Sequence, residues 1–454
     1  MHKKLKNIEN FAKALGGKIV SNVENIESFS GKISTNSKEI EENDFFIPLI
    51  GENFDAHQFI ESALEKGVGT IFEKGRVTDF RDNKIYIEVD DSLKALQLLG
   101  KNNRIEVNPK IIGITGSNGK TSTKEITFAI LKTLTDKGFA SKKNLNNHIG
   151  VPLNLVELDE SIEVAIIEMG ASALKEIDLL ASLSLPDIGI ITNIAPAHLE
   201  GFKSIENILI AKTELFKHTK GLKIVNNDNK YLNSIIKDYK NIESFGFLPE
   251  SSLNIINIIT RDMIHSIKFS FKGEKYSFKT DLPGIHNVYN LMGALLALNG
   301  LGYDMEKLVS IIPDLKVEID GRLKKVNYKT HIIYDDSYNS NPLSVKSGVE
   351  YFYKDSKDRE KILILGEMRE MGEYSEHYHK EIGEFISNYH FDKIFLLGEK
   401  TKVMIPKQKL GADVTFFNSL DNLKERFHTF LNLNKNYSIY IKGSRGNHLD
   451  KILP

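Results

Sequence analysis

The chain has 454 residues, a length too great for one hydrophobic core and suited to about three domains. Its 60 basic and 61 acidic residues nearly cancel, so the net charge gives no reason to expect nucleic acid or a membrane surface as a partner. The sequence has no cysteine, which excludes disulfides, thiolate metal sites and cysteine nucleophiles and fits a reducing compartment. No apolar run approaches membrane-spanning length, so we expect a cytoplasmic protein with no membrane insertion.

The first hundred residues alternate short apolar runs with helical patterns, which predicts a small α/β domain. The apolar and helical segments are 45–50, 54–66, 69–72, 84–89 and 92–101. The polar segment 104–110, which contains Pro109, predicts a linker into a second domain.

Residues 113–121 read Gly-Ile-Thr-Gly-Ser-Asn-Gly-Lys-Thr and fit the phosphate-binding pattern GxxxxGK[ST] at every fixed position. Glycines let successive backbone N–H groups face one point, Lys120 can reach the outer phosphates, and the Thr121 hydroxyl can bind Mg²⁺. An apolar strand precedes the loop, and a helical pattern that ends at Gly138 follows it. The loop predicts a nucleoside triphosphate as ligand; the alternative is a chance match in an ordinary strand-to-helix turn.

The second domain has further apolar runs, and its strands are expected at 111–115, 164–168, 188–192 and 223–226. Open α/β sheets bind ligands at the carboxyl ends of their strands. Glu168 ends one of these strands and can hold Mg²⁺ beside the phosphates, although a glutamate there can also be merely solvated. His198 follows the next strand at the same edge, although a lone histidine is more often structural than a ligand.

The segment 311–321 carries a proline, scattered charges and a glycine, and it predicts a second hinge. Beyond it, strands are expected at 332–335, 361–365, 393–397, 414–417 and 438–441. Helical patterns such as 375–389 alternate with these strands. This alternation predicts a third α/β domain of Rossmann-like type, although it contains no GxGxxG run.

Several motifs, taken in order, resemble those of the Mur ligases, cytoplasmic enzymes that build peptidoglycan precursors. They are GITGSNGKTSTKE at 113–125, NLNNHIGVP at 144–152, EMG at 168–170, TNIAPAHLEGF at 192–202, AKTEL at 211–215 and PGIHN at 283–287. The resemblance covers nearly the whole chain. It implies three α/β domains, of which the central one is the phosphate-loop ATPase-like domain with a parallel-rich sheet.

Three runs in the third domain resemble the members of the family that add D-alanyl-D-alanine to UDP-N-acetylmuramoyl-tripeptide. They are DDSYNSNP at 335–342, GEMREMGEYS at 366–375 and KGSRG at 442–446, and the DNPR run of members that add diaminopimelate is absent. One departure lies at 35–38, where Thr-Asn-Ser-Lys stands in place of the usual Asp-Ser/Thr-Arg run. Lysine keeps the charge but loses the bidentate fork of arginine, which affects the expected contact with the UDP part.

The resemblance implies a reaction, its cofactors and a division of labour between domains. ATP phosphorylates a carboxylate to an acyl phosphate, which the incoming amine attacks, and Mg²⁺ assists. The acceptor is UDP-MurNAc-tripeptide, the amine is D-alanyl-D-alanine, and the enzyme is expected to be a monomer. The implied domains are 1–107 for the UDP substrate, 108–313 for ATP and 314–454 for the amine substrate.

The resemblance also assigns roles to individual residues. The catalytic group is Lys120, Glu168, His198 and Lys212. The implied metal ligands are Thr121, Glu168, His198 and a carbamylated Lys212. ATP contacts are expected from Gly116, Ser117, Asn118, Gly119, Lys120, Thr121, Ser122, His286, Asn287, Asn290, Arg322 and Asp336. Substrate contacts are expected from Ser37, Lys38, Asp55, His57, Asn144, Asn147, Asn339, Asn341, Lys442 and Arg445.

Other functions remain open at this point. Within the superfamily, the chain could instead be a tripeptide-forming Mur ligase or a folylpolyglutamate synthase, against which the third-domain runs argue. In a different class, it could be a phosphate-loop switch or an inactive homologue that only binds UDP-linked precursors. The third residue of the acceptor peptide and the oligomeric state do not follow from the sequence.

Overall fold

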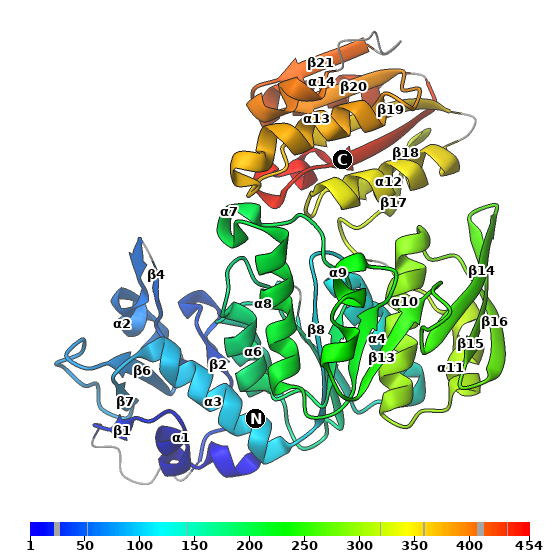
Figure 1. Cartoon of the computed structure of the whole chain (residues 1–454). Helices are drawn as coiled ribbons and strands as arrows, with labels where there is room; N and C mark the ends of the chain where they lie inside the picture. Colours follow the sequence, from blue (N-terminus) through cyan, green and yellow to red (C-terminus); the bar gives the residue numbers. More distant parts are fainter. Residues whose placement is uncertain are drawn as a thin grey trace.

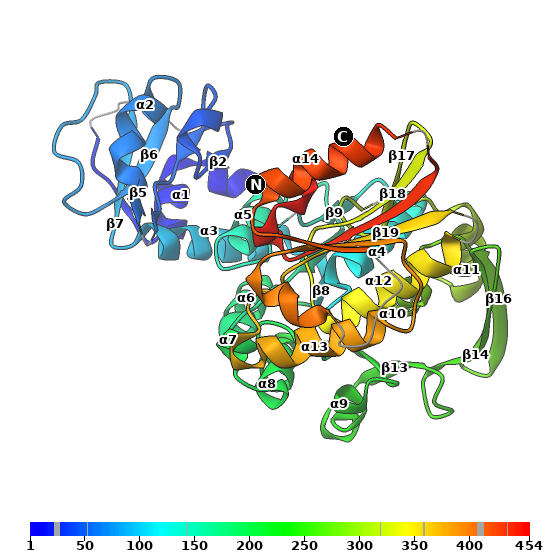
Figure 2. The same cartoon turned by 90° about the horizontal axis from the view of Figure 1, so that it is seen from above.

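The computed structural model describes residues 1–21, 28–51, 53–142, 144–317, 319–356, 359–405, 413–433 and 435–454. Three α/β domains follow one another along the chain, each built on its own main sheet (Figure 1). The third domain lies over the central one, and the first lies to the side of the central domain (Figures 1 and 2). The expected three-domain α/β class is therefore confirmed.

The first domain has a five-stranded sheet in the order β1-β7-β6-β3-β2. Its strands are β1 (Lys18–Ile19), β2 (Ile33–Ser34), β3 (Phe45–Phe46), β6 (Gly69–Glu73) and β7 (Ile85–Val89). Only β1 pairs antiparallel with its neighbour. The rings of Phe11, Phe29 and Phe45 pack with their centroids 4.8 to 5.0 Å apart and form the centre of this core.

The predicted linker at 104–110 is wrong, because helix α3 (Ser92–Val107) continues through most of it. Arg104 lies in α3 with its side chain only 1% exposed. Its guanidinium donates to the carbonyls of Ser184, at 2.8 Å, and Leu185, at 3.1 Å, at the end of α6 (Glu176–Ser184), and pairs with Asp187. These are the carbonyls that a helix end leaves without partners, so Arg104 fixes α3 to the central domain.

The central domain has a nine-stranded sheet in the order β16-β15-β14-β13-β12-β11-β8-β10-β9. The four predicted strands are β8 (Lys110–Thr115), β10 (Val164–Glu168), β11 (Ile188–Ile191) and β12 (Lys223–Asn226). Five strands were not predicted: β9 (Gly138–Ala140), β13 (Ile242–Gly246), β14 (Leu253–Arg261), β15 (Ile264–Phe271) and β16 (Glu274–Thr280). The sheet is parallel from β9 to β14 and antiparallel beyond.

Helices cover both faces of this sheet, so its central strands are buried on both sides. On one face, Ile112 and Ile114 of β8 pack with residues of α4 (Lys120–Leu134) and α10 (Ile285–Gly300). On the other face, Ile111 packs in the cluster that contains α6 and α8 (Ile205–His218). The carboxyl ends of the strands are left for the loops that follow them.

The third domain has a six-stranded sheet in the order β17-β18-β22-β19-β20-β21. The five predicted strands are β18 (His331–Asp336), β19 (Glu360–Gly366), β20 (Lys393–Leu397), β21 (Asp413–Phe417) and β22 (Tyr437–Lys442). The unpredicted β17 (Lys324–Tyr328) is an antiparallel edge strand. Helices α12 (Pro342–Asp355) and α13 (Ser375–Ile386) lie on one face, and α14 (Leu420–Leu431) packs on the other.

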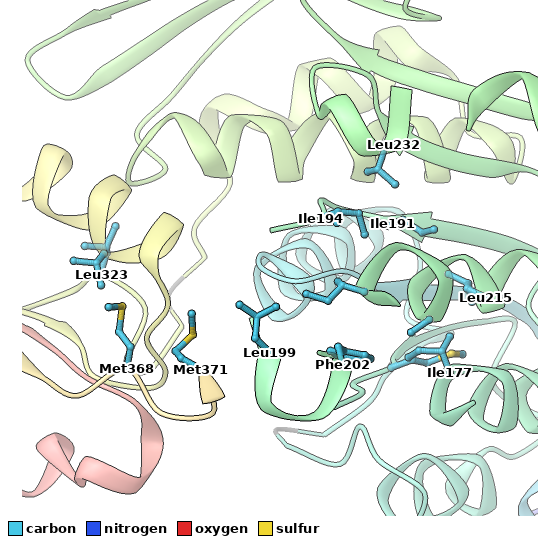
Figure 3. Close-up of a cluster of buried hydrophobic side chains, with 14 of the residues drawn as sticks. Ile177, Ile191, Ile194, Leu199, Phe202, Leu215, Leu232, Leu323, Met368 and Met371 are labelled. Atoms are coloured by element: carbon cyan, nitrogen blue, oxygen red, sulfur yellow. The ribbon is translucent and has the colours of Figure 1, made fainter. Parts of the chain in front are cut away.

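One apolar cluster crosses from the central domain into the third. Figure 3 shows Met368 and Met371 of the third domain facing Leu199, which begins α7 (Leu199–Phe202). The hinge predicted at 311–321 starts too early, because Ile311 ends helix α11 (Met305–Ile311) and Ile312–Asp314 form a 3₁₀ turn. The residues at 315–317 and 319–323 have no helix or strand, and Glu318 lies outside the described residues. The main sheets fall inside the limits 1–107, 108–313 and 314–454, which as domain boundaries stay predictions.

In the described part of the chain, no helix combines the length and the apolar character needed to cross a membrane.

The buried Arg104 gives a testable consequence for stability. Replacing it by leucine removes the buried donor to the carbonyls of Ser184 and Leu185, whereas Asp187 keeps the Ile111 N–H and Lys110 as partners, so Arg104→Leu should lower the free energy of unfolding by about 2 to 4 kcal/mol. Urea unfolding followed by circular dichroism measures the shift. Arg81→Leu is the control, because Arg81 pairs with Glu61 on the surface and should contribute little. Equal transition midpoints for the two variants would contradict the anchoring role of Arg104.

Candidate active site

The loop between β8 and α4 has a backbone that only glycine allows at two positions. Gly116 has φ of 145° and Gly119 has φ of 80°. A Cβ atom at Gly116 would lie 2.0 Å from Thr192 Oγ1, and one at Gly119 would lie 2.5 Å from Asn290 Oδ1. The loop is therefore shaped both by its own dihedral angles and by the side chains packed against it.

Residues after β11 brace this loop. Ser117 exchanges hydrogen bonds with Ala195, and the Asn118 N–H donates to Asn193 Oδ1 at 3.0 Å. The Thr192 hydroxyl donates to the Asn118 carbonyl at 2.5 Å. Within the run 192–202, only His198 was predicted to have a role. The structure shows that residues at the start of this run bond to the phosphate-binding loop.

Lys120 starts α4 with its amine turned back over the loop. Its Nζ donates to the carbonyl of Gly116 at 2.8 Å and to that of Ser117 at 3.3 Å. Burial lowers the pKa of Lys120 to about 8, while nearby Glu168 raises it and Arg322 lowers it further. A cation at this place is available to phosphate oxygens bound by the loop.

Glu168 ends β10 beside the loop and is 2% exposed. Its Oε1 accepts from Asn146 Nδ2 at 2.8 Å, and Ser141 Oγ accepts its backbone N–H at 3.0 Å. Its Oε2 is buried and has no hydrogen-bond partner among the described residues. An unsatisfied buried carboxylate oxygen fits a bound cation, which is the role expected from the position of Glu168.

His198 and Lys212 occupy different surroundings. His198 has φ of 52°, and its Nδ1 contacts the carboxylate of Glu370 from the third domain. Lys212, in α8, is 2% exposed; its Nζ donates to the Ala171 carbonyl at 3.3 Å and lies 5.3 Å from the centre of the Phe202 ring.

Among the described residues, the buried Lys212 amine has no counter-ion. In the part of the chain that the structure describes, no carboxylate lies within 4.0 Å of its Nζ. Burial, aided by the charge of Lys120, holds the pKa of Lys212 well below its usual range, although Glu176 and Glu214 oppose the shift. Burial therefore favours the neutral form of this amine more than that of an exposed lysine.

A cavity of about 480 Å³ lies between the central and third domains, a size that suits a small ligand. Among its lining residues are the predicted Asn118, Gly119, Ser122, His286, Asn287, Asn290, Arg322 and Asp336. Sequence reasoning missed Asn226, Asp228 and Asn229, which also line it. These three residues end or follow β12, so the rule that ligands bind at strand carboxyl ends could have found them.

Lys442 also lines this cavity, not the larger one described next. It is buried, and its Nζ donates to Asp336 Oδ2 at 2.6 Å and to the Asn339 carbonyl at 3.0 Å. The Tyr440 hydroxyl donates to the same Asp336 oxygen at 2.8 Å. Lys442, which was predicted to contact the substrate, therefore lies in the same cavity as the predicted nucleotide contacts. There its ammonium group balances the charge of Asp336.

A second cavity, of about 920 Å³, opens on the other side of Lys120. Its lining includes the predicted Lys120, Asn147, Glu168, His198, Arg322, Asn339 and Arg445. It also includes Asn146, Glu367, Arg369, Glu370 and Lys400, for which no role was predicted. The run 366–375 begins at the carboxyl end of β19, which is the signal for Glu367, Arg369 and Glu370.

The two domains touch directly around the phosphate-binding loop. Asn341 Nδ2 donates to Asn118 Oδ1 at 2.5 Å, and the Tyr338 hydroxyl donates to Asn144 Oδ1 at 2.7 Å. The guanidinium of Arg322 lies 4.6 Å from the centre of the Tyr338 ring. The predicted Asn144 and Asn341 are therefore interdomain contacts in this structure.

The four candidates in the first domain lie apart from both cavities. His57 Nδ1 lies 2.7 Å from Asp55 Oδ1, and its Nε2 accepts the Glu73 N–H at 3.1 Å, so this pair holds a turn against β6. The His57 backbone N–H is the main cause that lowers the pKa of Asp55. Ser37 lies in a short 3₁₀ turn with the exposed Lys38. Their contact with a substrate stays a prediction.

Two regions of the chain match described protein families. Residues 114–298 match the Mur ligase middle domain, and residues 321–445 match the Mur ligase, glutamate ligase domain. UDP-N-acetylmuramoyl-tripeptide--D-alanyl-D-alanine ligase of Bacillus subtilis (strain 168) is 33% identical over 431 residues, which cover 93% of this chain and 92% of that protein.

Solved structures give the same picture. A crystal structure of MurF from Acinetobacter baumannii has a TM-score of 0.86 and 26% identity, and covers 98% of this chain and 97% of that one. MurF ligase from Thermotoga maritima in complex with ADP has a TM-score of 0.79 and 25% identity, over 93% of this chain and 96% of that one.

Three α/β domains with two cavities on either side of a phosphate-binding loop define an enzyme of the phosphate-loop class. With these similarities along most of its length, the chain belongs to the Mur ligase family.

The buried pair of Lys442 and Asp336 predicts a strong effect of substitution. Lys442→Met keeps the length of the side chain but leaves the carboxylate of Asp336 without its counter-ion, so the variant should lose about 3 kcal/mol of stability. Urea unfolding is the measurement. Lys393→Met is the matched control, since Lys393 pairs with the exposed Asp413 on the surface of the same sheet. A loss in Lys442→Met no larger than in this control would show that the buried pair of Lys442 and Asp336 is not needed for stability.

Proposed function

We propose that the chain is an ATP-dependent ligase that joins D-alanyl-D-alanine to UDP-N-acetylmuramoyl-tripeptide in peptidoglycan precursor synthesis. The products are UDP-MurNAc-pentapeptide, ADP and phosphate. The observation that carries the proposal is the place of Arg322 and the phosphate-binding loop. Arg322 lines both cavities, and the loop lies between them, with Asn118 and Gly119 on the smaller cavity and Lys120 on the larger one. A nucleotide in the smaller cavity would therefore present its terminal phosphate to an acceptor in the larger cavity.

In the proposed reaction, the protein stabilises negative charge on the phosphate oxygens and forms no covalent bond to the substrates. The acceptor carboxylate attacks the terminal phosphorus and ADP leaves, which gives an acyl phosphate. The uncharged amine then attacks the acyl carbon, phosphate leaves with the bonding electrons, and the proton lost by nitrogen passes to the departing phosphate or to water. Lys120 and the loop N–H groups offset the charge that develops on the phosphate oxygens, and Arg322 stands where the two substrates meet.

The residues present fit a cation at the end of β10. Mg²⁺ neutralises phosphate charge when it is bound. Glu168 Oε2 is the buried oxygen available to hold it, and the Thr121 hydroxyl comes from the first turn of α4. The described residues contain no cluster of three or more His, Asp or Glu side chains able to hold a metal, so substrate oxygens and the Lys212 carbamate proposed below have to complete the ligand set.

The third domain supplies basic groups for the amine substrate. Arg369, Lys400 and Arg445 line the larger cavity, and Arg445 pairs with Asp450 at 3.1 Å. A dipeptide zwitterion needs its carboxylate neutralised while its amine faces the acyl phosphate. Lys442 is buried against Asp336, whereas Arg445 is exposed and lines the larger cavity, so we assign the contact with the dipeptide carboxylate to Arg445. The proposal also includes a cytoplasmic location, ATP and Mg²⁺ as cofactors and a monomeric enzyme.

The direct test of the function is a ligase assay with purified protein, ATP, Mg²⁺ and UDP-MurNAc-tripeptide, with products identified by mass spectrometry. D-alanyl-D-alanine should be used far better than D-alanine, L-lysine or meso-diaminopimelate. Lys120→Ala should lose at least a hundredfold in kcat, about 3 kcal/mol of transition-state stabilisation, with unfolding unchanged. Phosphate release without an amine would indicate a switch, and preference for a single amino acid would indicate another branch of the family.

Lys212 is predicted to carry a carbamate. A neutral buried amine can react with CO₂, and the product is an anionic oxygen ligand, whereas the free ammonium cannot bind a cation. Lys212→Ala should lose activity and regain part of it with added formate or acetate. Lys217→Ala, an exposed lysine on the same helix, is the control. Full activity of Lys212→Ala, or native mass spectra in bicarbonate that show only the unmodified amine, would count against the carbamate.

A further inference from the structure

Lys124 is a buried lysine that the proposed reaction does not use. It lies one turn after Lys120 in α4, and its side chain is 1% exposed. Its Nζ donates to the Ser141 carbonyl at 2.7 Å and pairs with Glu125 at 2.9 Å. A buried ammonium group is costly unless it is well bonded, and an apolar side chain would fill the same space at lower cost. The buried charge of Lys124 would be explained if its hydrogen bond to the Ser141 carbonyl has a functional role.

Ser141 connects Lys124 to Glu168. It follows directly after β9, where the paired register of β9 and β10 ends at Ala140 and Ile166. Its N–H donates to the Ile166 carbonyl at 2.9 Å, and its hydroxyl accepts the Glu168 N–H at 3.0 Å. Ser141 therefore extends the ladder by one residue and fixes the backbone of Glu168.

Asn154 stabilises a second contact of Glu168, the one with Asn146. It is fully buried in α5 (Gly150–Glu157) and bonds to both ends of the loop before this helix, which the structure describes at 142 and 144–149. It accepts the Lys142 N–H at 2.9 Å and donates to the Leu145 and Gly150 carbonyls at 2.8 Å. This loop delivers Asn146, whose side chain donates to Glu168 Oε1 and whose carbonyl accepts the Gly170 N–H, both at 2.8 Å.

We infer that Lys124 and Asn154 are positioning residues for the Glu168 carboxylate. Lys124 fixes its backbone through Ser141, and Asn154 fixes its Oε1 through Asn146. With both held, Oε2 remains the one oxygen of this carboxylate without a protein partner among the described residues, and it is directed to a divalent cation. This inference rests on the proposed function, because that function requires the cation.

The test measures cation binding directly, without turnover. Mn²⁺ replaces Mg²⁺, and electron paramagnetic resonance counts free Mn²⁺ over the full-length protein saturated with ADP. Lys124→Met should weaken Mn²⁺ binding about tenfold, since the free energy of orienting one ligand is lost. The affinity for ADP in EDTA should change less than twofold. Ser141→Ala is the milder second variant, which removes only the acceptor for the Glu168 N–H, and it should weaken Mn²⁺ binding in the same direction.

Asn103→Leu separates positioning from general stability. Asn103 is also buried, and it donates to the carbonyls of Leu155 and Leu158 at the far end of α5, at 2.7 and 2.8 Å. The Asn103→Leu variant should therefore lower the melting temperature of the protein without changing its affinity for Mn²⁺. Lys132→Met, on the exposed part of α4, should change neither.

Unchanged Mn²⁺ affinity in Lys124→Met or in Ser141→Ala, or an equal loss in Asn103→Leu, would overturn the inference. The ligase assay of the wild-type protein, run in parallel, judges the proposed function separately. Dipeptide-dependent turnover with unchanged Mn²⁺ affinity in the variants would contradict the positioning role alone.

Discussion

The turn at residues 116–119 is the constraint on which the rest of the active site depends. Its N–H groups can face one point because Gly116 and Gly119 adopt positive φ. Side chains at these two positions are also excluded because Thr192 and Asn290 occupy the space that they would need. The turn is thus enclosed by two other segments, one from the end of β11 and one from the first turns of α10. Those segments in turn carry the residues that line the smaller cavity, so loop geometry and cavity shape are set together.

The sequence was sufficient for the strands that helices cover on both faces. Continuous apolar runs mark β8, β10, β11 and the inner strands of the third domain, and their limits were predicted to within a residue or two. Among the strands that were missed, β9 is an edge strand of only three residues, and β15 alternates exposed and buried residues, so it lacks the continuous apolar run that marks the buried strands. The linker at 104–110 failed for a different reason. A polar segment normally indicates a loop, whereas the charge of Arg104 is buried against the end of another helix, a tertiary contact with no local signal.

The candidate site shows the same division. Local pattern and strand position indicate the phosphate-binding loop and Glu168. The structure has this loop between β8 and α4 and Glu168 at the end of β10, while their roles stay predictions. The position of Lys442 could not be predicted from local sequence pattern. Whether a basic residue contacts a substrate or a neighbouring carboxylate depends on strand register, and the register of β18 and β22 places Lys442 opposite Asp336. Asn146 shows the converse. Its run contains three asparagines, and only the folded loop reveals that this one reaches Glu168.

The position of both cavities follows from the way the two larger sheets face each other. Glu168 and Thr192 lie at the carboxyl ends of β10 and β11, while Asp336 and Lys442 end β18 and β22 of the third domain. Parallel strands gather their following loops at that edge, so each sheet alone would offer one half of a site. When the two edges meet, the phosphate-binding loop of one sheet is covered by Asn341 of the other, and Arg322, from the segment between the domains, reaches both cavities. An enzyme that must bring a nucleotide, an acceptor and an amine to one phosphorus and one carbon gains from this arrangement. Substrates can be held by both edges while the reacting atoms meet at the boundary between the domains.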